Sequence, residues 1–400
     1  MKEIHTESLE QAVQQTQEYI IRYRRYFHQH PELSLQEYHT AETLEKELER
    51  LGIAHKRIGE TGVLGIIHGQ RGNGRVVALR ADMDALPIQE TGKSVYCSQR
   101  ENVMHACGHD AHTACLLGAA KILQESRGGF AGEVRLIFQP AEEIGKGAFP
   151  FIEQGALEGV SRVMGLHIAP GLPCGTVGIT PGLNNAAVDH FKILVHGKSA
   201  HVSAPQLGVD ALYTASQIVV ALQALVTRRT SPTEPVIIGI GKLSSGTSYN
   251  IVAEEAELEG TTRTVSLEMR AQIKEQINTA VRNIADAYGA QADVIWTDIA
   301  SPVINDEGVC AELAGVVGSV YGGRCPVVRR ELSLGGDNFA EFLLQVPGAY
   351  LSLGTGNPEK PQTLHSLHHN ALDIEENALV IGTGLYVQAA FWWLSAEELA

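Results

Sequence analysis

The chain has 400 residues, of which 44% are hydrophobic and 19% are charged, and its formal net charge is -15 at pH 7. A chain of this length exceeds one ordinary hydrophobic core, so we expect two domains. The acidic balance, spread without a long acidic tail, argues against a nucleic-acid partner and against an anionic membrane surface. The composition therefore favours small molecules or other copies of the chain as partners.

The N-terminal stretch has no basic segment followed by an apolar one, and no window reaches the roughly 18 apolar residues that a membrane span needs. The 6 cysteines form no Cys-x-x-Cys pair and no small disulfide framework, which fits a reducing compartment. We therefore expect a cytoplasmic protein.

Apolar residues at helical spacing predict helices over residues 8–30 and 36–51. Two strand-like runs, 63–68 and 76–80, follow on either side of the glycine-rich GQRGNGR, and this pattern predicts a hairpin. The second run leads into ADMDALP, so its aspartates lie at a strand end, where α/β sheets commonly bind their ligands.

The next segment, MHACGHDAHT at 104–113, concentrates metal-binding side chains. It contains the thiol of Cys107 and three imidazoles, and thiolate sulfur with imidazole nitrogen suits Zn(II) and related ions. The apolar run over 114–123 predicts a helix that begins directly after this cluster. Chance is the alternative explanation, because 16 His and 6 Cys in the chain will form some local clusters.

Two further strands end in polar residues. The strand predicted over 133–138 leads into QPAEE, with Glu142 and Glu143 side by side, and the strand predicted over 162–166 leads into His167. Adjacent carboxylates can point to different places, so one can bind a metal while the other acts as a general base. The alternatives are a solvated acidic pair and an ordinary packing histidine.

The pattern changes from residue 188 to residue 297, where the predicted order of elements is β-α-β-β-α-β, the ferredoxin-like unit. The earlier pattern then resumes. We therefore predict an α/β protein of two domains: residues 1–187 and 298–400 form a catalytic domain with a mixed central sheet flanked by helices, and 188–297 form an inserted α+β domain.

A loop rich in Gly and Pro near the C-terminus carries His365, His368 and His369, where ordinary packing does not explain three imidazoles. Combined with Cys107, His109 and Glu143, they provide sulfur, nitrogen and oxygen ligands sufficient for two ions. Two-metal sites are a recognised means of hydrolysing amides.

The motifs HACGHDAHT, QPAEE, GLH, GKSAH and the C-terminal LHH with DIEE resemble the aminoacylase-type branch of the dinuclear metallopeptidases, which includes hippurate hydrolase, indole-acetyl-amino-acid hydrolase and bacterial N-acyl-L-amino-acid amidohydrolases. The resemblance runs through nearly the whole chain. It implies a metal-binding catalytic domain, an inserted lid or dimerisation domain, and two divalent ions per subunit, which could be Zn, Mn, Co or Ni.

The resemblance also implies roles for individual residues. The metal ligands would be Cys107, His109, Glu143, His167 and His368, and Glu142 would be the general base and acid. His368 is preferred to its neighbours because DIEE follows it, although His369 and Asn370 depart from the usual pattern. Asp84 and Asp110 would orient the ligands, with turn capping as the alternative.

In the inserted domain, His201 in GKSAH resembles the histidine that stabilises the oxyanion, in relatives often from the partner subunit. Asn250 and Arg263 resemble residues that hold the α-carboxylate of the substrate, a role that suits the planar fork of arginine. Gly335 and Gly336 lie in a loop resembling one that lines the substrate pocket, although the following Asp-Asn differs from the more usual Glu-Asp.

These features lead us to expect a homodimeric hydrolase of N-acyl-L-amino acids, in which metal-bound hydroxide attacks the amide carbon. The alternatives are a dipeptidase or carboxypeptidase and a deacetylase dedicated to an intermediate such as N-acetyl-diaminopimelate. A non-catalytic metal-binding or ligand-binding protein is disfavoured because Glu142 and all the proposed ligands are present, and a structural zinc protein would need four protein ligands and no adjacent base.

Overall fold

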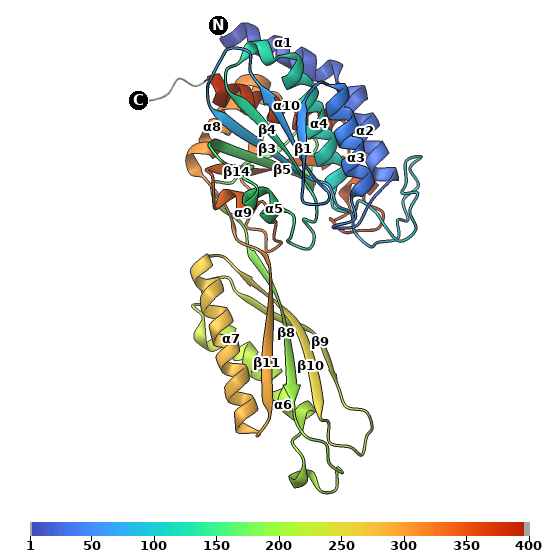
Figure 1. Ribbon diagram of the computed structural model, residues 1–400, viewed down its shortest axis with the longest axis vertical. Coiled ribbons are helices and arrows are strands. Elements are labelled where there is room, and N and C mark those ends of the chain that lie inside the picture. Colours follow the sequence, from blue (N-terminus) through green and yellow to red (C-terminus); the bar gives the residue numbers. More distant parts are fainter. Residues whose placement is uncertain (1, 396–400) are drawn as a thin grey trace. The chain divides into compact units, whose positions relative to one another are not determined.

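The computed structural model describes residues 2–395 and divides them into two compact units (Figure 1). The first unit contains three stretches of chain: the part up to Asn184, Ile304–Glu331 and the part from Asn338 onward. The second unit contains Asn185–Val303 and Leu332–Asp337.

The first unit is built on a mixed sheet with the strand order β1-β2-β4-β3-β5-β14-β6-β13. Its strands are β1 (Ala54–Ile58), β2 (Gly62–His68), β3 (Val76–Asp82), β4 (Glu133–Gln139), β5 (Val160–Pro173), β6 (Val177–Gly178), β13 (Val327–Val328) and β14 (Gly348–Gly356). The four central strands β4, β3, β5 and β14 are parallel. They are almost continuously buried because helices cover both faces of a parallel sheet.

The helices of this unit are α1 (Lys2–Gln15), α2 (Gln17–Gln29), α3 (Tyr38–Arg50), α4 (His109–Glu125), α5 (Ala148–Glu153), α8 (Glu307–Tyr321), α9 (Ala340–Leu343) and α10 (Ala378–Ser395), with short 3-10 turns at Arg127–Gly129, Gly322–Arg324 and Pro361–Leu364. Figure 1 shows them flanking the sheet. The predicted class, a mixed central sheet flanked by helices, is confirmed. The α4 helix packs against α2 and α10 and is buried on almost every side.

The sequence-based expectation about membrane-spanning windows needs a correction at α10. This helix is long and apolar enough to cross a membrane by length and composition, whereas the sequence analysis expects no such window. However, 78% of its 18 residues are buried inside the protein, and it packs against α1, α4 and α8. A core helix meets the same criteria, because a helix surrounded by other elements is apolar on all sides.

The hairpin predicted for residues 63–80 is wrong. The β4 strand lies between the two runs and pairs antiparallel with β2 and parallel with β3. The glycine-rich connection between β2 and β3 bonds to the residues before β4: Gly69 N–H donates to the Gly132 carbonyl, at 2.8 Å. Its glycines therefore permit close backbone approach to a distant segment and do not form a two-residue hairpin turn.

The second unit has the predicted order β-α-β-β-α-β. Its elements are β8 (Ala187–His196), α6 (Ala211–Ala224), β9 (Ile237–Ser245), β10 (Glu255–Thr264), α7 (Leu267–Ala287) and β11 (Gln291–Ala300), with a 3-10 turn at Pro205–Leu207 and a π turn at Leu225–Arg229. The antiparallel sheet has the order β11-β8-β10-β9, and α6 and α7 pack on it around a core of its own. Asp210 and Ser266 cap the two helices. A separate pair joins β7 (Gly182–Asn185) to β12 (Val303–Asn305).

The structure places Leu332–Asp337 in the second unit, whereas the sequence analysis includes this stretch in the catalytic domain. Backbone pairing explains the difference: Ala186 N–H donates to the Ser333 carbonyl at 2.9 Å. In addition, a Cβ atom at Gly336 would lie 2.4 Å from the Val188 side chain, so this glycine allows close packing on β8.

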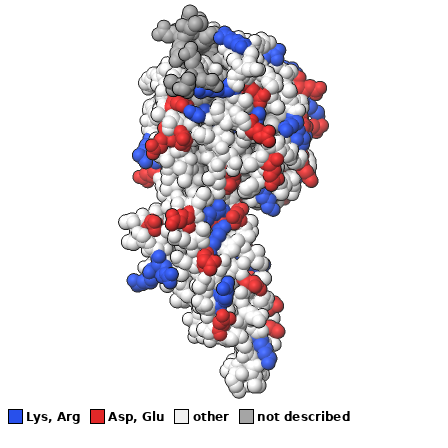
Figure 2. Space-filling view, turned by 60° about the vertical axis from the view of Figure 1, so that its left-hand side comes forward, with Lys and Arg blue, Asp and Glu red and all other residues white. Residues whose placement is uncertain are grey.

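Charged side chains of both signs are scattered over the face drawn in Figure 2, where Lys and Arg are interspersed with Asp and Glu. That face shows no large patch of a single sign.

We predict opposite effects for two Gly→Ala substitutions inside helices. At Gly118 in α4 a Cβ atom would lie 2.7 Å from the buried Ile20 side chain, whereas at Gly315 in α8 it would meet no atom of the described residues within 4 Å. Gly118→Ala should lower the free energy of unfolding by about 1–3 kcal/mol through overpacking. Gly315→Ala should raise it by about 0.5–1 kcal/mol through helix propensity. Denaturant unfolding measures both, and equal stabilisation by the two variants would contradict the packing argument.

Candidate active site

The candidate site lies at the carboxyl ends of the parallel strands, where α/β sheets commonly bind ligands. Asp82 at the end of β3 is level with Gln139 at the end of β4, and β4 leads into the loop that carries Glu142 and Glu143. The α4 helix begins at His109, directly after Gly108, which has φ 86°. A Cβ atom at Gly108 would lie 2.3 Å from the Ile168 side chain, so this position requires glycine.

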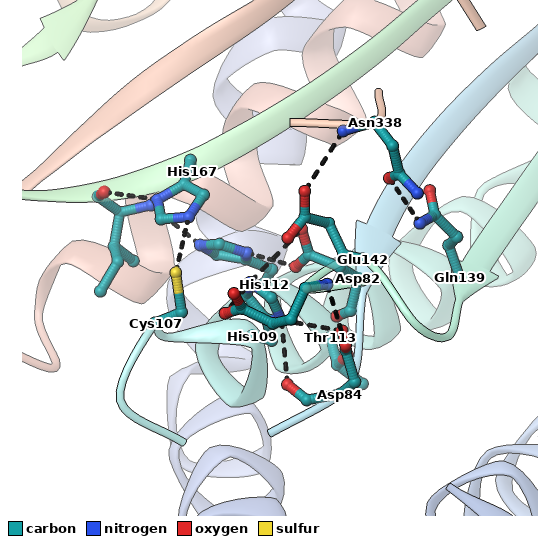
Figure 3. Close-up of polar contacts among 12 residues, drawn as sticks. Asp82, Asp84, Cys107, His109, His112, Thr113, Gln139, Glu142, His167 and Asn338 are labelled. Carbon is teal, nitrogen blue, oxygen red and sulfur yellow. Dashed lines mark hydrogen bonds and ion pairs between the residues drawn. The ribbon is translucent and has the colours of Figure 1, made fainter. Parts of the chain in front are cut away.

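The five metal ligands predicted from the sequence come together at this edge (Figure 3 labels three of them, with Glu142). Ligand atoms of Cys107, His109 and His167 lie within 4.8 Å of one another, and so do those of Cys107, Glu143 and His368. The Cys107 Sγ atom is 3.4 Å from His167 Nε2. His368 Nε2 is 3.5 Å from Glu143 Oε1. The two groups share Cys107, as expected of two adjacent ions with one common ligand.

Backbone carbonyls orient the two inner imidazoles. His109 Nδ1 lies 2.9 Å from the Asp84 carbonyl and 3.2 Å from its side-chain Oδ1, and His167 Nδ1 lies 2.7 Å from the Ile168 carbonyl. Since only a protonated Nδ1 can donate to these oxygens, the Nε2 atom of each ring is presented to the site. This is the usual outer-shell arrangement of histidines that bind metal.

Two buried atoms in the cluster have no hydrogen-bond partner among the described residues: His109 Nε2 and Glu143 Oε1, which lie 3.8 Å apart. Burial alone would lower the pKa of His109, but the charge of Asp82 outweighs it and raises the pKa well above its usual range. Burial also raises the pKa of the Cys107 thiol well above its usual range. A buried positive charge is thus favoured here, and a divalent cation supplies it by displacing these protons. The donor set therefore fits a metal centre.

A second cluster of possible ligands, formed by Asp82, His109 and His112, has a different explanation. His112 Nδ1 is 2.6 Å from Asp82 Oδ1, and His112 Nε2 accepts the Ile168 N–H at 2.9 Å. Both ring nitrogens are therefore occupied by protein partners. We interpret His112 as a neutral ring that fixes β5 next to His167.

Glu142 is 9% exposed and accepts the Asn338 backbone N–H at 3.2 Å (Figure 3). The Asn338 side-chain oxygen in turn accepts from Gln139 at 2.8 Å and from Arg80 at 3.2 Å, and Arg80 donates to Asp82 at 2.7 Å. This buried network joins Glu142 to Asp82. The sequence analysis does not assign Gln139, Arg80 or Asn338 to the site, because nothing local in their motifs indicates that they meet.

The two aspartates predicted to orient ligands have different surroundings. Asp84 contacts His109 as described, and its Oδ2 accepts the Glu143 N–H at 3.1 Å, so it touches two predicted ligands. Asp110, the residue after His109, instead bonds to Arg24 at 3.0 Å and to His28 at 2.7 Å.

The other C-terminal imidazoles lie apart from these groups: the rings of His365 and His369 stack on each other with centroids 4.0 Å apart.

The remaining predicted residues belong to the second unit. His201 is exposed, and its Nδ1 accepts the Ser203 N–H at 3.1 Å. Asn250 lies beside it, since Val202 N–H donates to the Asn250 carbonyl at 3.1 Å. Arg263 is half-buried on β10, and the loop glycines Gly335 and Gly336 are exposed.

The fold and the donor set define a two-unit α/β protein with a candidate dinuclear metal centre. The chain belongs to the peptidase family M20/M25/M40, whose model matches residues 78–391. The resemblance inferred from the sequence is thereby confirmed.

Individual proteins match over most of the chain. An N-acetyl-L-cysteine deacetylase of Bacillus subtilis is 38% identical over 381 residues, covering 95% of this chain and 89% of that protein. A thermostable carboxypeptidase of Saccharolobus solfataricus is 39% identical over 381 residues, covering 94% of this chain and 95% of that protein. A solved structure of a dinuclear metal-binding M20 peptidase from Bacillus subtilis has a TM-score of 0.82 and 35% identity, covering 96% of this chain and 100% of that chain.

A buried acid holds the loop that carries Glu142. Glu37 Oε1 accepts the Ala141 N–H at 2.8 Å, and Oε2 accepts the Thr61 hydroxyl at 2.9 Å. Ala141 has φ 51°, a left-handed conformation that an alanine rarely adopts without such support. Burial and the nearby charge of Asp84 raise the pKa of Glu37 to about 7.

This pKa predicts how stability depends on pH. The native pKa of Glu37 is raised above the unfolded value, so its contribution is fully present below pH 4.5 and is lost as pH rises through about 7. At ~1.4 kcal/mol per pKa unit the loss is about 3 kcal/mol. In chelator-treated protein, Glu37→Gln should flatten the dependence of unfolding free energy on pH between 5 and 8. Glu49→Gln, at an exposed position of α3, the helix that directly follows Glu37, should leave it unchanged. An equal slope in the Glu37 variant would rule out this explanation.

Proposed function

We propose that the protein is a metal-dependent amidohydrolase that cleaves N-acyl-L-amino acids to a carboxylate and a free amino acid. One observation carries the proposal: two groups of ligand atoms share Cys107, and Glu142 lies beside them with its own carboxylate oxygen within 4.8 Å of His109 and Glu143 ligand atoms. Family membership and the deacetylase relative support the same reaction class.

In this proposal Cys107, His109 and His167 hold one divalent ion, and Cys107, Glu143 and His368 hold the other. When bound, the two ions polarise the amide carbonyl and acidify water. The carboxylate of Glu142 takes a proton from the attacking water and returns it to the leaving nitrogen. The Asn338 N–H fixes one oxygen of Glu142, which orients the carboxylate for this transfer.

We further propose that the inserted unit binds the substrate. Because His201 Nδ1 accepts a backbone N–H, the ring carries its proton on Nε2 and can donate to a developing oxyanion. Asn250 and the fork of Arg263 suit the free α-carboxylate, and the Gly335-Gly336 loop would accommodate the acyl side. Asp84 acts through His109 and Glu143, and Asp110 acts through its neighbour His109.

A carboxypeptidase is the second candidate, because one relative of similar identity carries that name. Both reactions cleave an amide beside a free carboxylate, so the site geometry alone does not separate them. A panel of N-acetyl, N-benzoyl and longer N-acyl amino acids, with unblocked dipeptides alongside, separates them by the release of free amino acid. Cleavage of unblocked dipeptides alone would favour the peptidase.

The central test combines metal removal with Glu142→Gln. Chelator-treated wild-type protein should lose turnover and regain it when Zn(II), Mn(II), Co(II) or Ni(II) is added back to about two ions per chain. Glu142→Gln should bind the same number of ions, because the amide keeps the shape of the side chain. Its kcat should fall by about 10²–10⁴, the usual contribution of a general base.

Metal analysis and amino-acid release are measured on the same samples. Unchanged turnover in Glu142→Gln would remove the role assigned to Glu142. Full occupancy by metal without turnover on any substrate of the panel would overturn the enzymatic proposal in favour of a binding protein.

We also propose a homodimer formed through the inserted unit, in which His201 serves the site of the partner subunit. The expected result is a dimer by light scattering. The variants His201→Ala and Glu142→Gln should each be inactive alone. When the two variants are mixed so that they exchange subunits, the hybrid dimers should regain partial activity. An active monomer would contradict the role in trans.

A cytoplasmic location completes the proposal. All six cysteines are free thiols in the structure, which supports a reducing compartment.

A further inference from the structure

Arg24 in α2 is a buried cation that joins three carboxylates from two separate parts of the chain. Its side chain is 2% exposed. Its Nε lies 3.0 Å from Asp110, its Nη2 3.1 Å from Asp373 and its Nη1 3.5 Å from Glu376. Each nitrogen of the guanidinium thus faces a different carboxylate, and an ammonium group could not do this.

The two parts of the chain that Arg24 joins are those that carry His109 and His368, two of the proposed ligands. Asp110 directly follows His109 in the first turn of α4. Asp373 and Glu376 belong to the irregular segment between residues 365 and 377, which also carries His368. No helix or strand positions this segment, whereas His109 and His167 lie on regular elements.

His368 therefore depends on tertiary contacts for its position. It is exposed and has φ 66°, and its N–H donates to the Ala106 carbonyl at 2.8 Å. Among the other bonds that hold the segment are those of Asp373, which accepts from Arg24 and from the Tyr96 hydroxyl at 2.9 Å. The Tyr96 ring also lies under the Arg24 guanidinium, 4.7 Å from its centroid.

The helix side of the junction has a second anchor. His28 Nδ1 lies 2.7 Å from Asp110, so Asp110 keeps a partner if Arg24 is shortened. On the loop side, Tyr96 still bonds to Asp373 and Arg25 to Glu376, but no helix or strand holds this segment. A substitution at Arg24 should therefore disturb His368 more than His109, which α4 and the Asp84 carbonyl hold in place.

We propose that Arg24 is a positioning residue that sets His368 against the Cys107 and His109 segment and so determines how tightly the ion of Cys107, Glu143 and His368 is bound. This inference rests on the proposed function, since it assumes that His368 is a ligand. It adds a residue that lies outside every motif in the sequence analysis.

The test measures the binding of two Co(II) or Zn(II) ions to the whole protein by competition with a chelator. Arg24→Lys should weaken one of the two ions by about ten- to a hundredfold, the usual effect of losing an outer-shell partner, and leave the other unchanged. Asp373→Asn should weaken the same ion to a smaller extent. The matched control is Arg22→Lys: Arg22 is exposed on the same helix, and its guanidinium lies over the rings of Tyr19 and Tyr23, so both affinities should stay at the wild-type values.

A double-mutant cycle assigns the effect to His368. His368→Ala should remove the same ion, and adding Arg24→Lys to it should change nothing further, because the two residues act through one ligand. An undiminished effect of Arg24→Lys in that background overturns the inference, and so do wild-type affinities in Arg24→Lys. If Arg24→Lys fails to fold, the double-mutant cycle of Asp373→Asn with His368→Ala tests the inference in its place, with the same criteria. If the wild-type protein binds fewer than two ions, the proposed function itself is overturned. The metal add-back assay measures this ion count independently of the Arg24 variants.

Discussion

The candidate site depends on one electrostatic constraint, which is that electron-pair donors converge where the chain provides no matching proton donors. His109 Nε2 and Glu143 Oε1 are buried 3.8 Å apart without hydrogen-bond partners among the described residues, and Cys107 is buried beside them. Burying such atoms unpaired costs several kcal/mol for each charge. A cation between them removes that cost, so this arrangement of donors fits a metal centre.

The surrounding fold keeps the donors in this arrangement without satisfying them. The carbonyls of Asp84 and Ile168 accept hydrogen bonds from the Nδ1–H groups of His109 and His167, which directs both Nε2 atoms inward. Asp82 bonds to Arg80 and His112, so its charge is balanced before it could serve as a ligand. The carboxylates next to the site therefore differ in role because their partners differ: Asp82 is bonded to Arg80 and His112, and Glu143 Oε1 is left for an ion.

The parts of this arrangement that lie in continuous motifs could be predicted from the sequence. HACGHDAHT begins a helix and QPAEE ends a strand, and the carboxyl ends of parallel strands meet at one edge. GLH differs from its prediction, because β5 continues beyond His167 to Pro173. The pairing of β2 and β3 with β4 could not be predicted locally, because the apolar runs of both strands fit a hairpin equally well. Which strands pair depends on β4, a strand some 50 residues further along the chain. No short-range sequence pattern indicates that pairing.

The same limit applies to single residues that act at long range. Asn338 reaches Glu142 from a segment 196 residues away along the chain, and Glu37 reaches Ala141 across 104 residues. Neither residue type is unusual in its own segment. What distinguishes them is burial next to a group that needs a partner, which only the folded chain reveals.

The two proposed ions differ in how the chain supports their ligands. His109 and His167 are placed by α4 and β5, so their positions follow from the packing of the sheet. His368 lies on an exposed, irregular segment, and such a segment gains its order from a few specific bonds and not from a regular ladder. A buried guanidinium can hold such a segment in place of secondary structure, because it bonds several carboxylates at once. Its planar fork is pre-organised, so little side-chain entropy is lost for each bond that forms. The dependence of the second ligand group on Arg24 is thus the physical consequence of placing one ligand outside the sheet.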